Sequence, residues 1–178
     1  LKDFSLPGNE IDPNDQDGEM RLRNVAVKGL YQPDTIATYQ HRGATFLVMA
    51  NEGDARDNGS GDSEDERRGS SGSTSVEYVV DGSELGRLNL SNVDSVRGGP
   101  LVKFGGHSFT IRDADGRIVF DSGSQLDREA MRLGIYDDGR SDNKGVEPEG
   151  LALLRVKGRT LAFIGLERTL KSAIAVYD

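Results

Sequence analysis

The sequence has 178 residues, which suits a single domain with its own hydrophobic core. Its net charge of -8 at pH 7 argues against a nucleic-acid partner, because binding to a phosphate backbone requires a basic surface. The chain has no cysteine, which excludes disulfides, a thiolate nucleophile and a cysteine-ligated zinc site.

No run of residues is long and apolar enough to predict a membrane-spanning helix. The chain begins at Leu1 without a signal peptide, and we expect a processed chain or a fragment of a larger protein.

The segment IDPNDQDG near the start is rich in oxygen-bearing side chains, which are the ligands that calcium prefers. Its spacing does not fit an EF-hand loop, because the glycine comes one position late and no glutamate follows at the right distance. Two interpretations stay open. The weaker one is a calcium site formed by Asp12, Asn14 and Asp17, and the favoured one is a turn in which Asx side chains cap the backbone.

Two segments predict β-hairpins with a basic turn, PDTIATYQHRGATFLVMANE (residues 33–52) and PEGLALLRVKGRTLAFIGLE (148–167). The two align without a gap over twenty positions. The alignment matches Asp34 with Glu149, Gly43 with Gly158, and Glu52 with Glu167. A unit repeated at such a separation is typical of arrays and propellers.

Between and after these hairpins, most segments also predict strands. Residues 53–75 have almost no apolar side chain and predict a flexible, acidic, Gly/Ser-rich loop. Single strands are predicted at 76–80, 85–90 and 173–177, and a hairpin with an Asp-Gly turn at 109–121. Only 126–133 predicts a helix, with Asp127 as its N-cap. The balance is that of an all-β meander with roughly ten strands.

The two histidines have no partner motif that predicts catalysis. His41 falls in the turn of the first hairpin, where solvent exposure is expected. For His107, which follows two glycines, packing or hydrogen bonding is favoured over a catalytic role.

Several segments, in the same order and over most of the chain, resemble the choice-of-anchor I family of surface proteins. They are LPGNEIDPNDQDG, VKGLYQPDTIATY, TFLVMANEGDAR, FGGHSFTIRDADGRIVFDSG, SDNKGVEPEGLALL and GRTLAFIGLER. The resemblance implies a β-propeller of WD-type or YVTN-like blades, exported and often tethered at the cell surface, with members frequently labelled alkaline-phosphatase-like.

A blade needs roughly 40 to 45 residues and a closed propeller 4 to 8 blades, so the chain is long enough for two to three blades. We therefore expect a partial propeller. The remainder of the ring, from the same or a neighbouring polypeptide, is the expected partner.

The acids at the hairpin ends are the candidate site. With the second hairpin centred on Gly158, Glu149 and Glu167 are equally far from the turn and are predicted to face each other, as are Asp34 and Glu52 in the first. Like charges that face each other across a strand pair are destabilising, so we expect something to compensate them.

Three interpretations follow for this set of acids, to which the neighbouring Glu147 belongs. Calcium is the first, with Asp34, Glu52, Glu147, Glu149 and Glu167 as ligands. Charge balance by Arg56 and Arg168 is the second, and it is slightly favoured. The third, raised by the resemblance, is a calcium-dependent phosphomonoester hydrolase in which the arginines bind phosphate.

Overall fold

The computed structural model describes residues 1–56, 66–68, 83–96 and 98–178. Strands dominate these residues, which confirms the all-β prediction, and one short α-helix and one 3-10 helix accompany them. None of the helices in the described part of the chain is long and apolar enough to cross a membrane.

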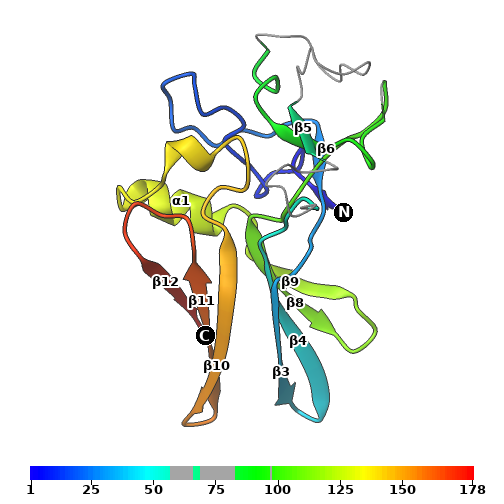
Figure 1. The fold of residues 1–178 in the computed structure, drawn as a ribbon. Coiled ribbons are helices and arrows are strands. Elements are labelled where there is room, and N and C mark those ends of the chain that lie inside the picture. Colours follow the sequence, from blue (N-terminus) through cyan, green and yellow to red (C-terminus); the bar gives the residue numbers. More distant parts are fainter. Residues whose placement is uncertain (57–65, 69–82, 97) are drawn as a thin grey trace.

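The strands form three sheets (Figure 1). The four-stranded sheet has the order β3 (Thr35–His41), β4 (Ala44–Asn51), β8 (Ser108–Asp113) and β9 (Ile118–Asp121). The three-stranded sheet has the order β10 (Pro148–Val156), β11 (Arg159–Leu166) and β12 (Ala173–Tyr177). Both are antiparallel throughout, and β10 lies against β3 and β4.

The third sheet departs from the predicted antiparallel meander. Its order is β1 (Lys2–Asp3), β2 (Val27–Gly29), β7 (Leu101–Lys103), β6 (Asn89–Ser91) and β5 (Glu66–Arg68). Strands β2 and β7 pair in parallel, and between them the chain forms the hairpin β3–β4 and then strands β5 and β6. Within the described residues, the three sheets do not close into a ring.

The two predicted hairpins are equivalent in structure. Each turns through two residues with positive φ, Arg42 (50°) and Gly43 (81°) in the first, Lys157 (49°) and Gly158 (82°) in the second. This is the pattern of a type I′ turn, whose twist matches that of the flanking strands, and glycine suits its second position.

The strand register differs from the prediction, because the two-residue turn places the hairpin centre before its glycine. In the first hairpin Thr35 pairs with Ala50, which sets Asp34 beside Asn51 rather than Glu52. In the second, a β-bulge lies between Pro148 and Leu151, and the residue that bonds to the Glu167 N–H is Glu147 (2.9 Å). The expected facing pairs are therefore wrong by one or two positions.

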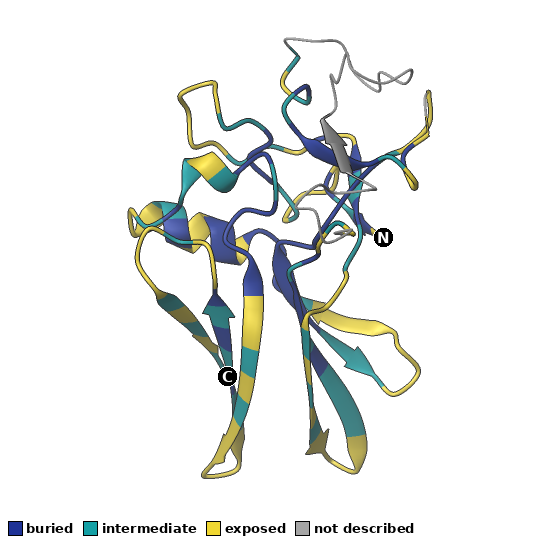
Figure 2. Ribbon diagram, in the orientation of Figure 1, coloured by how far each residue is buried: buried dark blue, intermediate teal, exposed yellow. Residues whose placement is uncertain are grey.

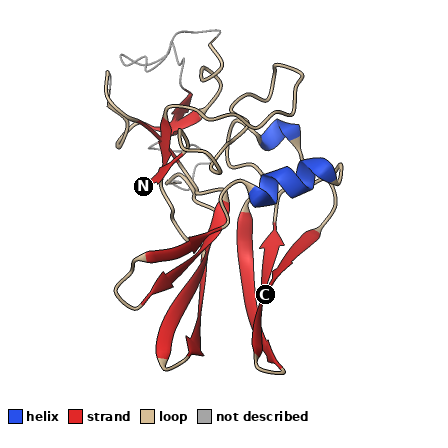
Figure 3. Ribbon diagram, turned by 180° about the vertical axis from the view of Figure 1, so that it is seen from behind, coloured by secondary structure: helices blue, strands red, loops and turns tan. Residues whose placement is uncertain are grey.

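Helix α1 (Gln125–Arg132) lies across one end of the two antiparallel sheets, beside the 3-10 helix η1 (Asp138–Arg140) (Figure 3). It confirms the predicted helix, but its N-cap is Ser124, which makes no side-chain capping bond. Asp127 lies inside the helix and is buried, so its predicted capping role is wrong. Its carboxylate instead bonds to other elements.

Two hydrophobic cores hold the fold together (Figure 2). One lies between the two antiparallel sheets and α1, where Val48, Phe109, Leu126 and Ile164 are almost completely buried. The other packs against the five-stranded sheet, which we call the mixed sheet because it contains both parallel and antiparallel pairs.

The predicted hairpin at 109–121 and the predicted strand at 173–177 are confirmed by β8, β9 and β12. The run 85–90 is mostly turn, and its strand begins only at Asn89. Most of the predicted loop at 53–75 and the whole predicted strand at 76–80 lie outside the described residues. Within that loop, Glu66–Arg68 forms β5, which pairs with β6.

Candidate functional site: an acidic cluster between the hairpins

Glu147 is the buried centre of the cluster, with 1 % of its surface exposed. It lies just before β10, and Arg140 donates to its Oε1 from Nε (3.0 Å), while Lys144 Nζ is 3.0 Å from its Oε2. Burial alone would raise the pKa of the Glu147 carboxyl, but the bonds from Arg140 and Lys144 outweigh burial and lower the pKa. Glu147 is therefore held as a carboxylate.

Lys144 joins the two halves of the cluster. Its ammonium group is 2.8 Å from Glu52 Oε1 as well as 3.0 Å from Glu147, and Asp54 is 3.5 Å away. Burial lowers the pKa of Lys144, but the bond to Glu52 and the charge of Glu147 reverse this, so the net direction is upward. The lysine thus keeps its charge between two carboxylates.

Glu52 follows β4 and is placed by a close backbone approach. Gly53 and Gly105 both have positive φ, and a Cβ atom on Gly105 would lie 2.0 Å from the Glu52 carbonyl oxygen. Only glycine fits at this crossing. The pKa of the Glu52 carboxyl is raised, first by burial and then by Glu147 and Glu167, although Lys144 acts in the opposite direction.

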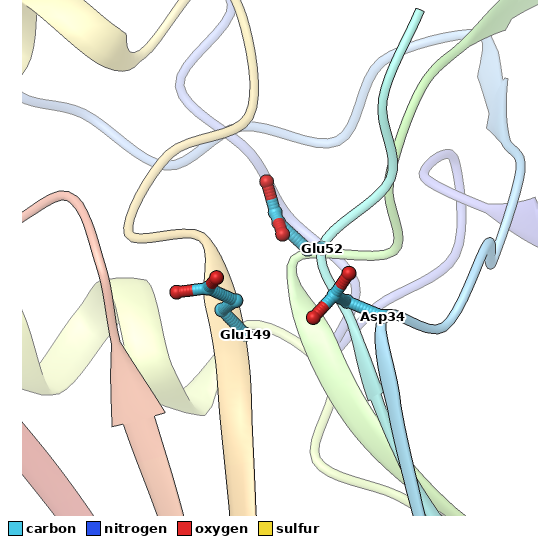
Figure 4. A group of neighbouring side chains, drawn as sticks. All are labelled: Asp34, Glu52 and Glu149. Carbon is cyan, nitrogen blue, oxygen red and sulfur yellow. The ribbon is translucent and has the colours of Figure 1, made fainter.

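The acids form two groups that share Glu52. In the outer group, Asp34, Glu52 and Glu149 each offer a carboxylate oxygen within 4.8 Å of the others. Figure 4 shows the three side chains near one another, with Glu149 on β10, Asp34 just before β3 and Glu52 just after β4. The bulge in β10 contains Glu149, and bulges commonly redirect a side chain in this way.

In the inner group, oxygens of Glu52, Glu147 and Glu167 lie within 4.8 Å of one another. Three cations contact this group: Lys144, Arg140, and Arg168, which is 2.9 Å from Glu167 and 4.0 Å from Glu147. Within the described part of the chain, no cation lies within ion-pair distance of Asp34 or Glu149 in the outer group. The two groups therefore differ in charge balance.

All five predicted acids come together, although they do so between the hairpins rather than across the strands of each one. Of the two predicted arginines, Arg168 lies in the cluster, and Arg56 is an exposed residue beyond Glu52. The predicted set omits Lys144 and Arg140. Their signal is slight: Lys144 stands three residues before Glu147, inside the tract SDNKG.

A family model for the choice-of-anchor I domain matches residues 1–178, the whole chain. The chain belongs to the choice-of-anchor I family. The family name indicates a surface-associated domain. No curated protein and no solved structure matches the sequence.

The weaker calcium candidates of this choice-of-anchor I domain are engaged within the protein. Asp12 is buried, and its Oδ2 accepts from the Arg21 N–H (2.8 Å). Burial raises the pKa of Asp12 to about 6. Asp17 contacts Arg23 (2.6 Å), and Asn14 caps the N–H of Gln16. These contacts support the interpretation as an Asx-rich turn.

A second buried polar network in the choice-of-anchor I domain joins α1 to the mixed sheet. His107 Nδ1 is 2.9 Å from Asp127 Oδ2, and its Nε2 contacts the ammonium group of Lys103. The other Asp127 oxygen accepts from the Val146 N–H (3.2 Å), next to Glu147. The sequence-based preference for a hydrogen-bonding role of His107 agrees with this geometry.

Proposed function

We propose that the domain is a propeller-type binding or scaffold module of an exported cell-surface protein, and that its two antiparallel sheets are consecutive blades. The observation that carries this proposal is the position of the repeated hairpins. Their first strands, β3 and β10, lie next to each other, and each sheet then continues outward in chain order. A blade is an antiparallel meander of this kind.

The exposed apolar face of the three-stranded sheet is an argument for a further blade packed beside it. By the strand register, Leu153, Ala162 and Tyr177 share the face toward the four-stranded sheet. The opposite face carries Leu154, Val156, Ile174 and Val176, which are 39–67 % exposed. A sheet with apolar residues on both faces is typical of a sheet packed on both sides. We propose the remainder of the propeller, or a neighbouring polypeptide, as the partner.

Calcium is the proposed stabiliser of the contact between the two sheets. The outer group supplies three carboxylates, an oxygen donor set that suits this ion, and backbone carbonyls and water would complete the coordination. The inner group has its own cations, so it supports the charge-balance interpretation instead. We therefore assign calcium to Asp34, Glu52 and Glu149.

Thermal unfolding with calcium chloride and with a chelator tests this assignment. A ligand that binds only the folded state at a hundred times its Kd stabilises by about 2.7 kcal/mol. We expect calcium to raise the Tm of the wild type and to have a much smaller effect on Glu149→Gln. Glu19→Gln is the matched control, because Glu19 is an exposed acid that does not belong to the acidic cluster, and it should respond to calcium like the wild type.

The opposite result would support charge balance alone. In that case calcium and chelator leave the Tm unchanged, while Arg140→Ala lowers it by leaving buried Glu147 without a main partner. Arg168→Ala should cost less, because Arg168 is half exposed and its contact with Glu147 is 4.0 Å long.

The alternative function is a calcium-dependent phosphomonoester hydrolase. It requires a cation that is available to phosphate, whereas Arg168 and Arg140 both contact carboxylates. This engagement is why we rank the scaffold first. Hydrolysis of a chromogenic phosphate ester that is abolished by a chelator and by Glu149→Gln would reverse the ranking.

A further inference from the structure

A pocket of about 570 Å³ lies between the two antiparallel sheets, and the proposed function makes no use of it. Helix α1 packs between the sheets at one end, with Leu126 and Ala130 in the shared core. Toward the turns of the hairpins the two sheets splay apart (Figure 1). The pocket occupies this wedge, from Gln125 at the start of α1 to Gly158 in the second turn.

Aromatic rings from four different strands line the pocket: Tyr39 on β3, Phe109 on β8, Phe120 on β9 and Tyr177 on β12. The ring centroid of Phe109 is 4.5 Å from that of Tyr177 and 5.4 Å from that of Phe120. These rings meet at angles of 61° and 45°, so they present both edges and faces. The aromatic rings of a ligand pack well against a pocket surface made of such edges and faces.

The pocket reaches the core at one end and has polar groups at the other. Val48, Phe109 and Ala162 line it although each is less than a tenth exposed. At the mouth, the guanidinium group of Arg159 contacts the Asp178 carboxylate. An apolar interior with few polar groups at the entrance is the general form of a small-molecule site, and the volume is in the usual range.

We infer that this pocket binds a small aromatic amphiphile, a molecule with one or two fused rings and a polar, hydrogen-bonding end. The rings would lie among Phe109, Phe120 and Tyr177, and the polar end would face the mouth at Arg159. A neutral polar end fits best, because Arg159 and Asp178 already balance each other's charge. The inference is independent of calcium, because the pocket and the acidic cluster have no lining residue in common.

Fluorescence titration with 6-propionyl-2-dimethylaminonaphthalene, a neutral naphthalene with a carbonyl at one end, tests the inference. We expect saturable enhancement with one site per chain. Ala162→Phe fills the pocket from the wall and should weaken binding at least tenfold. Ile174→Ser on the opposite face of the same sheet is the control and should leave the titration unchanged.

A second measurement does not depend on the filling variant. The chain has no tryptophan, so Tyr177→Trp and Val176→Trp each introduce one reporter, facing the pocket and the opposite face, respectively. The naphthalene should protect only the tryptophan at 177 from acrylamide quenching. Protection at 176 alone, enhancement lost in Ile174→Ser but kept in Ala162→Phe, or no saturable enhancement would overturn the inference.

Discussion

Lys144 Nζ lies 2.8 Å from Glu52 Oε1, and this ion pair joins the segment that follows the first hairpin to the loop that precedes the second. Both side chains are largely shielded from water, with 7 % and 12 % of their surfaces exposed. Removing Lys144 from this pair is costly, because the shielded carboxylates of Glu52 and Glu147 would each lose a positively charged partner.

Lys144→Met should therefore lower the free energy of unfolding by about 3 kcal/mol, the cost of removing one partner from a buried ion pair. Chemical denaturation measures this change. Lys171→Met, at an exposed lysine, is the matched control and should stay within about 0.5 kcal/mol of the wild type. Equal effects of the two substitutions would contradict the bridging role of Lys144.

The stability of the protein should increase with pH between about 7 and 9, because of Lys103. This lysine is fully buried, and burial lowers its pKa to about 7 from the ordinary 10.5, although Asp127 and Glu147 act in the opposite direction. Between these two values the unfolded chain binds more protons than the folded one at this site. Raising the pH through this window therefore favours the folded state.

The groups around Lys103 do not reverse this sign. Burial and the Lys103 charge lower the pKa of His107 below its ordinary value of 6.5. His107 therefore makes stability rise with pH only below about pH 6.5, outside this window. The pKa of Glu147 is lowered, so Glu147 stays ionised in the window. Burial also lowers the pKa of Lys2, although its ion pair with Asp121 (3.0 Å) acts in the opposite direction, so Lys2 adds to the same trend as Lys103. Denaturation at several pH values should show a slope of about 1 kcal/mol per pH unit. Lys103→Met should make this slope clearly smaller, and a wild-type curve that is flat or falls would contradict the prediction.

Glycine at the two hairpin turns should be required for stability rather than for the site. Gly43 and Gly158 have φ of 81° and 82°, in a region where an L side chain costs about 1–2 kcal/mol. Gly43→Ala and Gly158→Ala should each lower stability by about this amount. Gly150→Ala, where the new Cβ atom meets nothing within 4 Å and φ is not positive, is the control. Similar losses at all three positions would mean that turn conformation is not the cause.

Local pattern was enough to predict the hairpins, because an alternating apolar run on each side of a basic turn with glycine specifies both strands. The register was not predictable to the residue. It depends on whether the turn has two or three residues, and on the bulge at Glu149. The convergence of the four acids within the repeat followed from the repeat itself, since equivalent hairpin ends point to the same side, and Glu147 precedes the second hairpin by one residue. The positions of the cations could not be predicted in this way, because Lys144 and Arg140 come from a loop with no periodic pattern.

The parallel pairing of β2 with β7 was also out of reach of local pattern. The two strands are short and far apart in sequence, and only tertiary packing around Phe4 and Leu90 brings them into one sheet. Lys103, at the end of β7, would have been assigned to the surface by its residue type. Its burial against His107 is a property of the assembled fold.

The far face of the three-stranded sheet should make the isolated chain associate. Ile174 and Val176 are 67 % and 55 % exposed on β12, an edge strand of that sheet in the described structure. Edge strands with apolar side chains favour pairing with another chain, and lysine is the residue that natural edges use against it. Sedimentation of the double variant Ile174→Lys and Val176→Lys should give a monomer of 19.3 kDa over a concentration range in which the wild type forms larger species.

Val93→Lys is the control for this experiment, because Val93 is 69 % exposed but lies outside the strands. It should associate like the wild type. If the wild type is monomeric throughout, then the face needs no partner, and the proposed neighbouring blade loses its main support. If instead Val93→Lys also abolishes association, the contact between copies is not made by this face. Net charge cannot explain such a loss, because an added lysine brings the net charge of -8 closer to zero and weakens the repulsion between copies.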